Sequence, residues 1–164
     1  MTETEDLATA LVARLVEKGL TLTTAESCTG GWIAKAITDV AGSSACFGYG
    51  IVSYSNDAKM RLLNVTDALL TEHGAVSEPV GRAMAGGALR ISDADVAVAV
   101  SGVAGPSGGT AEKPVGTVWF AYSLRSQEGP TTDAECVRFD GERVDVRLRT
   151  VIHALTGLLD RVGP

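Results

Sequence analysis

The five residues 96–100 constrain the fold of this chain more than any other segment. They form an uninterrupted apolar run of strand length, Val-Ala-Val-Ala-Val. A strand with one face in water alternates apolar and polar residues, whereas a strand covered on both faces is apolar throughout. The run therefore predicts a central strand with helices packed on both sides, which is typical of an α/β protein.

Helical and strand patterns are intermixed along the rest of the chain. Residues 4–18 place Leu7, Leu11 and Leu15 on one helical face, and Gly19 follows as a C-cap. Further helices are expected over 29–39, 55–63, 66–72, 77–90 and 142–159. Strands are expected over 20–24, 50–54, 116–124 and 134–139, the last two as a hairpin. This order predicts a single three-layer α/β/α domain over 1–164 with a mixed sheet.

Composition excludes several classes of protein. No apolar run is long enough to span a bilayer, and residues 1–6 are acidic, unlike the start of a signal peptide. We therefore expect a cytoplasmic protein with no membrane contact. Twenty acidic against 14 basic residues give a net charge of −6. Binding to nucleic acid depends on a basic surface, so nucleic acid is not expected as a partner.

Cysteine and histidine are few and scattered. Cys28, Cys46 and Cys136 form no CxxC pair, and their odd number argues against a disulfide framework. His73 and His153 have no close ligand spacing. We expect no metal site.

The first segment suited to chemistry is residues 25–31, Ala-Glu-Ser-Cys-Thr-Gly-Gly, at the junction of a strand and a helix. Free N–H groups at a helix start bind anions, and the hydroxyls of Ser27 and Thr29 add donors. The alternative is an ordinary capped helix with a tight glycine turn. Cys28 in this position would be a reactive thiolate, although small buried cysteines are more common.

The second segment is the glycine-rich loop 101–117, directly after the central strand. Ligands in α/β proteins bind beyond the carboxyl ends of the strands. A loop this long in a compact domain usually has a function. It is not a Walker loop, because Lys113 lies beyond the last Gly pair and precedes Pro114. The loop predicts ligand binding, and the alternative is an irregular connection.

The third segment joins Gly42-Ser43-Ser44 to Tyr54 and Lys59 across a predicted strand. A lysine can activate a serine if its pKa falls from about 10.4 to roughly 7–8. Burial can supply this shift of about three units. On spacing alone, Lys59 is better interpreted as a solvated helix residue, as most lysines are.

Together these segments resemble the CinA C-terminal domain family, whose active members are nicotinamide-mononucleotide amidohydrolases. The resemblance is carried by residues 24–31, 42–44, 54–56, 58–59, 73–77 and 101–117, and by Phe139, Gly141 and Arg143. It implies hydrolysis of nicotinamide mononucleotide to nicotinic acid mononucleotide and ammonia, without cofactor or metal. The alternative is a nucleotide- or partner-binding domain without catalysis.

The resemblance also implies roles for individual residues. Ser44 is expected as nucleophile, Lys59 as general base and Tyr54 as a hydroxyl that relays the proton. Ser27 is the competing nucleophile, although its neighbours favour substrate binding. The residues expected to bind the substrate's phosphate and ribose are Thr29, Gly30, Gly31, Ser101, Gly108, Gly109, Thr110, Lys113 and Arg143. Small enzymes of this kind commonly pair, so a homodimer is expected.

Overall fold

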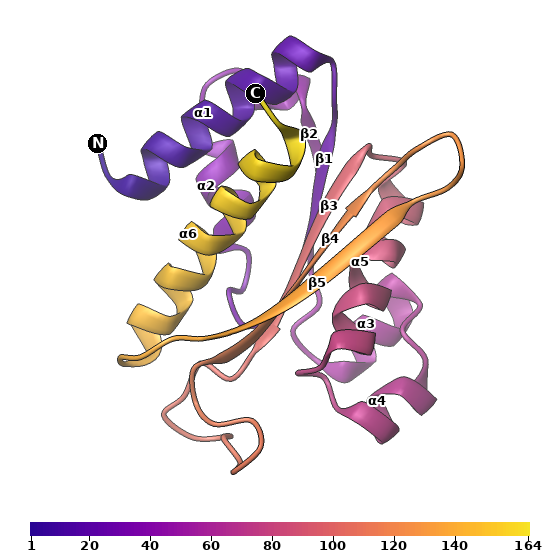
Figure 1. The fold of residues 1–164 in the computed structure, drawn as a ribbon, viewed down its shortest axis with the longest axis vertical. Coiled ribbons are helices and arrows are strands. Elements are labelled where there is room, and N and C mark those ends of the chain that lie inside the picture. Colours follow the sequence, from indigo (N-terminus) through magenta and orange to yellow (C-terminus); the bar gives the residue numbers. More distant parts are fainter.

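The computed structural model describes residues 1–164, which form a five-stranded mixed sheet between two layers of helices (Figure 1). The strand order is β2-β1-β3-β4-β5. Strands β1, β2 and β3 are mutually parallel, and β4 and β5 form the antiparallel hairpin. The strand bounds are β1 Leu22–Glu26, β2 Phe47–Val52, β3 Val96–Gly102, β4 Thr117–Leu124 and β5 Thr131–Arg138. The predicted α/β/α class with a mixed sheet is confirmed.

Helices lie on both faces of the sheet (Figure 1). One layer contains α1 Glu3–Lys18, α2 Trp32–Thr38 and α6 Arg143–Val162. The other contains α3 Asn56–Leu63, α4 Asp67–His73 and α5 Glu78–Ser92. A short 3₁₀ turn, η1 Ser43–Ala45, precedes β2. None of the six α-helices has the length and apolar content required to cross a bilayer.

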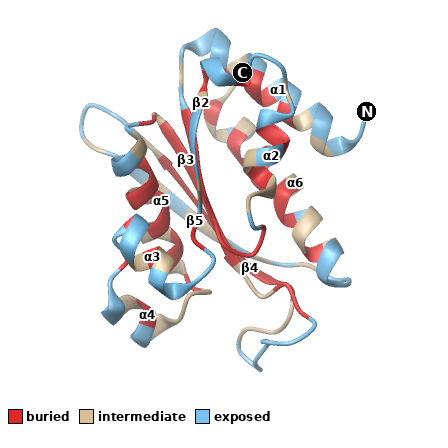
Figure 2. Cartoon of the chain, turned by 180° about the vertical axis from the view of Figure 1, so that it is seen from behind, coloured by how far each residue is buried: buried red, intermediate tan, exposed pale blue.

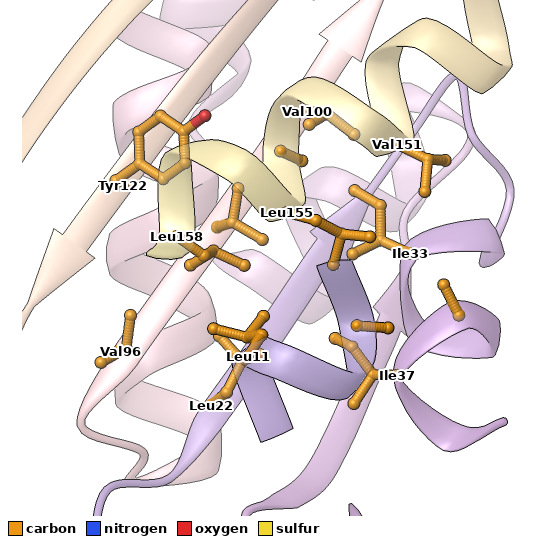
Figure 3. Packing of buried hydrophobic residues seen from close by; sticks show 14 of the residues in the cluster. Leu11, Leu22, Ile33, Ile37, Val96, Val100, Tyr122, Val151, Leu155 and Leu158 are labelled. Atoms are coloured by element: carbon orange, nitrogen blue, oxygen red, sulfur yellow. The ribbon is translucent and has the colours of Figure 1, made fainter. Parts of the chain in front are cut away.

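The two faces of the central strand differ in side-chain size. Val96, Val98 and Val100 pack into the core beneath α1, α2 and α6, as Figure 3 shows for Val96 and Val100. The intervening residues, Ala97 and Ala99, face α5. Small side chains on that face allow a helix to lie close to the sheet. The alternation of Val and Ala in the apolar run therefore determines which helices pack on each face of β3.

The first two strands lie two or three residues away from their predicted positions. β1 begins at Leu22 rather than residue 20, because the Leu20 N–H is bonded to the Leu15 carbonyl in the turn that ends α1. β2 begins at Phe47, which pairs with Leu22, and ends at Val52 rather than at residue 54. As a result, Ser27 and Ser53 follow directly after the carboxyl ends of their strands.

Candidate active site

A cavity of about 320 Å³ lies beyond the carboxyl ends of β1, β2 and β3. Its walls come from the turn after β1, the segment joining β2 to α3, the loop after β3 and the connection between α4 and α5, with Arg143 at the start of α6. Of the predicted site residues, the cavity brings together Ser27, Tyr54, Lys59, Ser101, Gly108 and Arg143. This location is where α/β folds bind ligands, because connections from several strands converge there.

The Lys59 amine contacts the Ser27 hydroxyl inside the cavity. Lys59 Nζ lies 3.0 Å from Ser27 Oγ, 2.7 Å from the Ser53 carbonyl oxygen and 3.4 Å from the Tyr54 carbonyl oxygen. A neutral amine has two N–H groups and one lone pair. If the two carbonyls accept the N–H groups, the lone pair remains for the Ser27 proton. This geometry suits a general base.

Burial prepares Lys59 to lose its proton. Its side chain is 1% exposed, and no carboxylate forms an ion pair with it. Removing an ammonium from water without an opposite charge disfavours its charged form. Burial accordingly lowers the pKa of Lys59 from 10.5 to about 8. The alternative of a solvated helix lysine is therefore wrong.

The expected pairing of Ser44 with Lys59 within one chain is also wrong. Ser44 lies in η1, before β2, and is exposed. Lys59 lies beyond the other end of the same strand, and the six residues of β2 extend about 20 Å. Ser44 and Lys59 are only fifteen positions apart in the sequence, but the extended strand between them crosses the whole sheet. Ser27 is the serine in contact with Lys59.

The helix start after β1 is not an open anion site. Glu26 is 1% exposed and accepts hydrogen bonds from Thr29 Oγ1, at 2.6 Å, and from the N–H groups of Ile33 and Ala34 at the start of α2. The chain's own carboxylate therefore uses the donors that a phosphate would need. Thr29, Gly30 and Gly31 line a separate hollow beside Trp32 and not the cavity.

The glycine-rich loop contributes only part of its predicted set. Gly108 lines the cavity, as does Ser101, whose hydroxyl donates to the Ala75 carbonyl at 2.9 Å. Gly109, Thr110 and Lys113 do not line it. Lys113 Nζ instead donates to the His73 carbonyl at 2.6 Å, at the end of α4. This lysine ties the loop to the neighbouring layer, and so its role in the structure is to hold the loop in place.

Arg143 and Tyr54 meet at the mouth of the cavity. Arg143 donates to the Tyr54 hydroxyl at 3.0 Å and to the Gly105 carbonyl at 2.7 Å. No carboxylate pairs with Arg143. Its positive charge is therefore available to an anionic ligand. The Tyr54 hydroxyl bonds to Arg143 and not to Lys59, whereas the Tyr54 carbonyl contacts Lys59.

Sequence reasoning missed the backbone part of the site. The Ser53 carbonyl makes the shortest contact with Lys59. A backbone carbonyl belongs to every residue, so no sequence motif indicates which one will contact the lysine. Asn56 also lines the cavity, although only its place in the Tyr-Ser-Asn motif pointed to it. Cys28 lies there too, but burial raises the pKa of its thiol to about 12. The hypothesis of an activated thiolate is therefore wrong.

Comparison with known proteins agrees with this geometry. The model of the CinA C-terminal domain matches residues 4–162. The nicotinamide-nucleotide amidohydrolase PncC of Escherichia coli K12 is 54% identical over 154 residues, covering 94% of this chain and 89% of that protein. A competence-damage inducible protein of Symbiobacterium thermophilum is 58% identical over 156 residues; the match covers 92% of this chain but 37% of that longer protein.

A solved relative has the same fold. The competence/damage inducible protein CihA of Agrobacterium tumefaciens superposes with a TM-score of 0.91 at 46% identity, covering 96% of this chain and 94% of that one. The family model, the relatives and the shared fold extend over nearly the whole chain, and the resemblance seen in its motifs is confirmed. The chain belongs to the CinA C-terminal domain family.

Proposed function

We propose that this protein hydrolyses the carboxamide of nicotinamide mononucleotide to nicotinic acid mononucleotide and ammonia, with Ser27 as nucleophile and Lys59 as general base. The observation that carries the proposal is the 3.0 Å contact between Ser27 Oγ and a buried lysine amine. The substrate is suggested by the name of the Escherichia coli relative, which aligns with 94% of this chain.

The first half of the reaction forms an acyl-enzyme. Ser27 Oγ attacks the carboxamide carbon while its proton passes to the lone pair of Lys59 Nζ. Collapse of the tetrahedral intermediate breaks the C–N bond, and Lys59 returns the proton to the departing ammonia. The backbone N–H groups of Cys28 and Thr29 form no backbone hydrogen bonds, so they are candidate donors to the oxyanion.

The second half of the reaction releases the acid. Water takes the place vacated by ammonia and attacks the ester carbonyl, giving its proton to Lys59. The ester C–O bond then breaks, and the proton returns to Ser27 Oγ. The product is the pyridine carboxylic acid, and every proton is accounted for by one amine and one hydroxyl.

The mouth of the cavity suits the charged end of the substrate. Arg143 borders both the cavity and an adjoining hollow of about 670 Å³, which Arg147 also borders while its guanidinium donates to the Cys28 and Thr29 carbonyls. Neither arginine pairs with a carboxylate. In a chain of net charge −6, two such groups provide a local site for a phosphate. The nicotinamide ring would then enter toward Ser27.

One assay tests this proposal. The purified protein is incubated with nicotinamide mononucleotide, and ammonia and nicotinic acid mononucleotide are measured with and without a chelator. We expect both products in equal amounts, unaffected by the chelator, and at least about a thousandfold less of each from the Ser27→Ala variant. Binding of the nucleotide without turnover would contradict the proposal and favour the non-catalytic alternative.

The setting of the reaction belongs to the same proposal. We infer a cytoplasmic homodimer, acting in the recycling of pyridine nucleotides. The support is the nicotinamide nucleotide in the name of the Escherichia coli relative, and a second copy is expected because closed two-fold dimers are the commonest oligomers.

A further inference from the structure

Strand β2 leaves one edge of the sheet open. It is the outermost strand and pairs only with β1. Its residues, Phe47–Val52, carry no charge, and Tyr49 and Val52 are 51% and 45% exposed. Figure 2 shows most of this strand in the colour of exposed residues. The unpaired backbone groups of an exposed, uncharged edge strand can pair with a strand of another chain.

The backbone of β2 has donors and acceptors available for that pairing. The backbone N–H and C=O groups of Tyr49 and Ser53 point toward β1. The Tyr49 carbonyl accepts from Thr23 Oγ1, and the Ser53 N–H donates to the Glu26 carbonyl. Alternation along a strand then turns the N–H and C=O groups of Gly50 and Val52 outward.

The opposite edge of the sheet is protected in the usual way. Strand β5 carries Asp133, Glu135 and Arg138. Charged side chains on an edge strand discourage pairing with another strand. The difference between the two edges indicates that another strand pairs with β2 and that none pairs with the outer edge of β5.

We propose that β2 pairs antiparallel with β2 of a second copy of this chain, and that the partner's Ser44 turn completes the mouth of the cavity. A second copy has the same net charge of −6, so it is repelled by most of the surface but not by an uncharged edge. A strongly charged partner would find no counter-charge on this edge. Antiparallel self-pairing is also isologous and closes as a two-fold dimer.

The register of such a pair brings the partner's η1 to the cavity. A two-fold axis at Tyr49 places the partner's Ser44 level with Tyr54, and an axis at Gly50 places it level with Asn56. Tyr54 and Asn56 both line the cavity. The exposed serine that lies far from Lys59 in its own chain thus reaches the site of the neighbouring chain. The catalytic part of this inference rests on the proposed function, whereas the assembly does not.

The assembly is tested by mass and by cross-linking. We expect the wild-type protein to sediment at twice its 16.9 kDa mass and the Tyr49→Lys variant to sediment as a monomer with an unchanged circular dichroism spectrum. The matched control is Thr131→Lys, an exposed residue of β5, which should remain a dimer.

Cross-linking keeps the test valid if the charged variant does not fold. In a Cys136→Ser background, Tyr49→Cys should be joined to its partner by a short bismaleimide cross-linker, which spans either register, and Thr131→Cys should not. A monomeric wild type would overturn the proposal. So would a Tyr49→Lys dimer together with an uncross-linked Tyr49→Cys variant.

Mixed dimers test whether the partner reaches the cavity. Ser27→Ala and Ser44→Trp chains with different tags are co-expressed, and the mixed dimer is isolated through both tags. Each parent homodimer should be inactive or strongly impaired, whereas the mixed dimer should have half the wild-type activity. Only the Ser44→Trp chain keeps Ser27, and its cavity receives an intact Ser44 from the partner.

The outcomes of this experiment separate the two proposals. Absence of rescue would show that Ser44 acts in its own chain, or not at all, and full activity of Ser44→Trp would show that the turn lies away from the cavity. Either result overturns the completion of the site. If the wild type itself releases no ammonia, the proposed function fails, and the cross-linking experiment still decides the assembly.

Discussion

Ser27 and Ser44 are two serines in similar local settings at opposite ends of one sheet. Each lies beside a strand and close to glycine, within the residues matched by the model of the CinA C-terminal domain. Ser27 follows the carboxyl end of β1 and is buried against Lys59, whereas Ser44 precedes β2 and is exposed. The comparison teaches that position relative to the strand's direction, and not the motif, determines which serine can be activated within one chain.

Replacing Ser27 should have the largest effect. Ser27→Ala removes the attacking oxygen while leaving β1 and its neighbours in place, and kcat should fall by about a thousandfold or more. Steady-state release of ammonia from nicotinamide mononucleotide measures the loss. Ser44→Ala is the matched control. If Ser44→Ala instead abolished turnover and Ser27→Ala kept it, the order of the two serines would be reversed.

Replacing Lys59 should have the next largest effect. Lys59→Met keeps the length of the stem but removes the base, so kcat should fall by about 10²–10⁴-fold with little change in KM. Lys35→Met, at an exposed lysine of α2, is the control and should be unaffected. Turnover by Lys59→Met within a factor of about two of the wild type would contradict the role of the amine.

The pH dependence of activity tests the same contact between Lys59 and Ser27. The pKa of Lys59 lies at about 8, and the base must be neutral before attack. Activity, measured as kcat/KM, should therefore rise about tenfold per pH unit below 8 and level off above it. A profile that is flat between pH 6 and 9, measured in buffers of constant ionic strength, would show that a group with this pKa is not the base.

Burial of Lys59 should also be visible in stability. Its folded pKa of about 8 is below the ordinary 10.5, so the unfolded chain binds more protons between these values. The free energy of unfolding therefore rises with pH from about 8 to 10.5, and below 8 the cost of the buried charge is fully present. Lys59→Met should be more stable than the wild type at pH 7, by about 1–3 kcal/mol.

Urea unfolding at several pH values measures this difference. The gain of Lys59→Met over the wild type should shrink above pH 8 and be lost near 10.5. Lys35→Met, whose lysine is exposed, should show no such gain. A Lys59→Met variant that is less stable at pH 7 would mean that the hydrogen bonds to the carbonyls outweigh the cost of burial.

The smallest effect is expected at Ser44. Ser44→Ala should leave kcat nearly unchanged and raise KM by about two- to fivefold, the value of one modest hydrogen bond at the mouth of the neighbouring cavity. Progress curves at substrate concentrations around KM resolve the change. A fall in kcat comparable to that of Ser27→Ala would contradict the proposal that Ser27 and not Ser44 is the nucleophile.

Much of the fold could be predicted because it depends on local signals. The apolar run in β3 required helices on both faces, and Gly19, in the left-handed conformation, ends α1 as expected. The order of elements and the β4–β5 hairpin also followed from pattern and turn residues. Strand limits were less certain, since hydrogen-bonded registers such as that of Phe47 with Leu22 depend on the neighbouring strand.

The candidate site could be predicted only as a set of segments. A sequence shows Glu26 as a polar residue beside a glycine turn, but not that its carboxylate caps α2 from within and so removes the expected phosphate site. It shows Lys113 as a free cation, but not that the amine holds the His73 carbonyl. Partners distant along the chain decide whether a donor remains available to a ligand.

The sequence by itself determined the α/β class, the family and the segments from which the cavity is built, because apolar periodicity and motif order are properties of neighbouring residues. Only the tertiary structure decided that Ser27, and not Ser44, meets Lys59. The physical reason is that an extended strand separates sequence neighbours by the width of the sheet, while parallel pairing brings the ends of β1 and β2 together. Burial of the lysine, which lowers the pKa of its amine, exists only after that packing has formed.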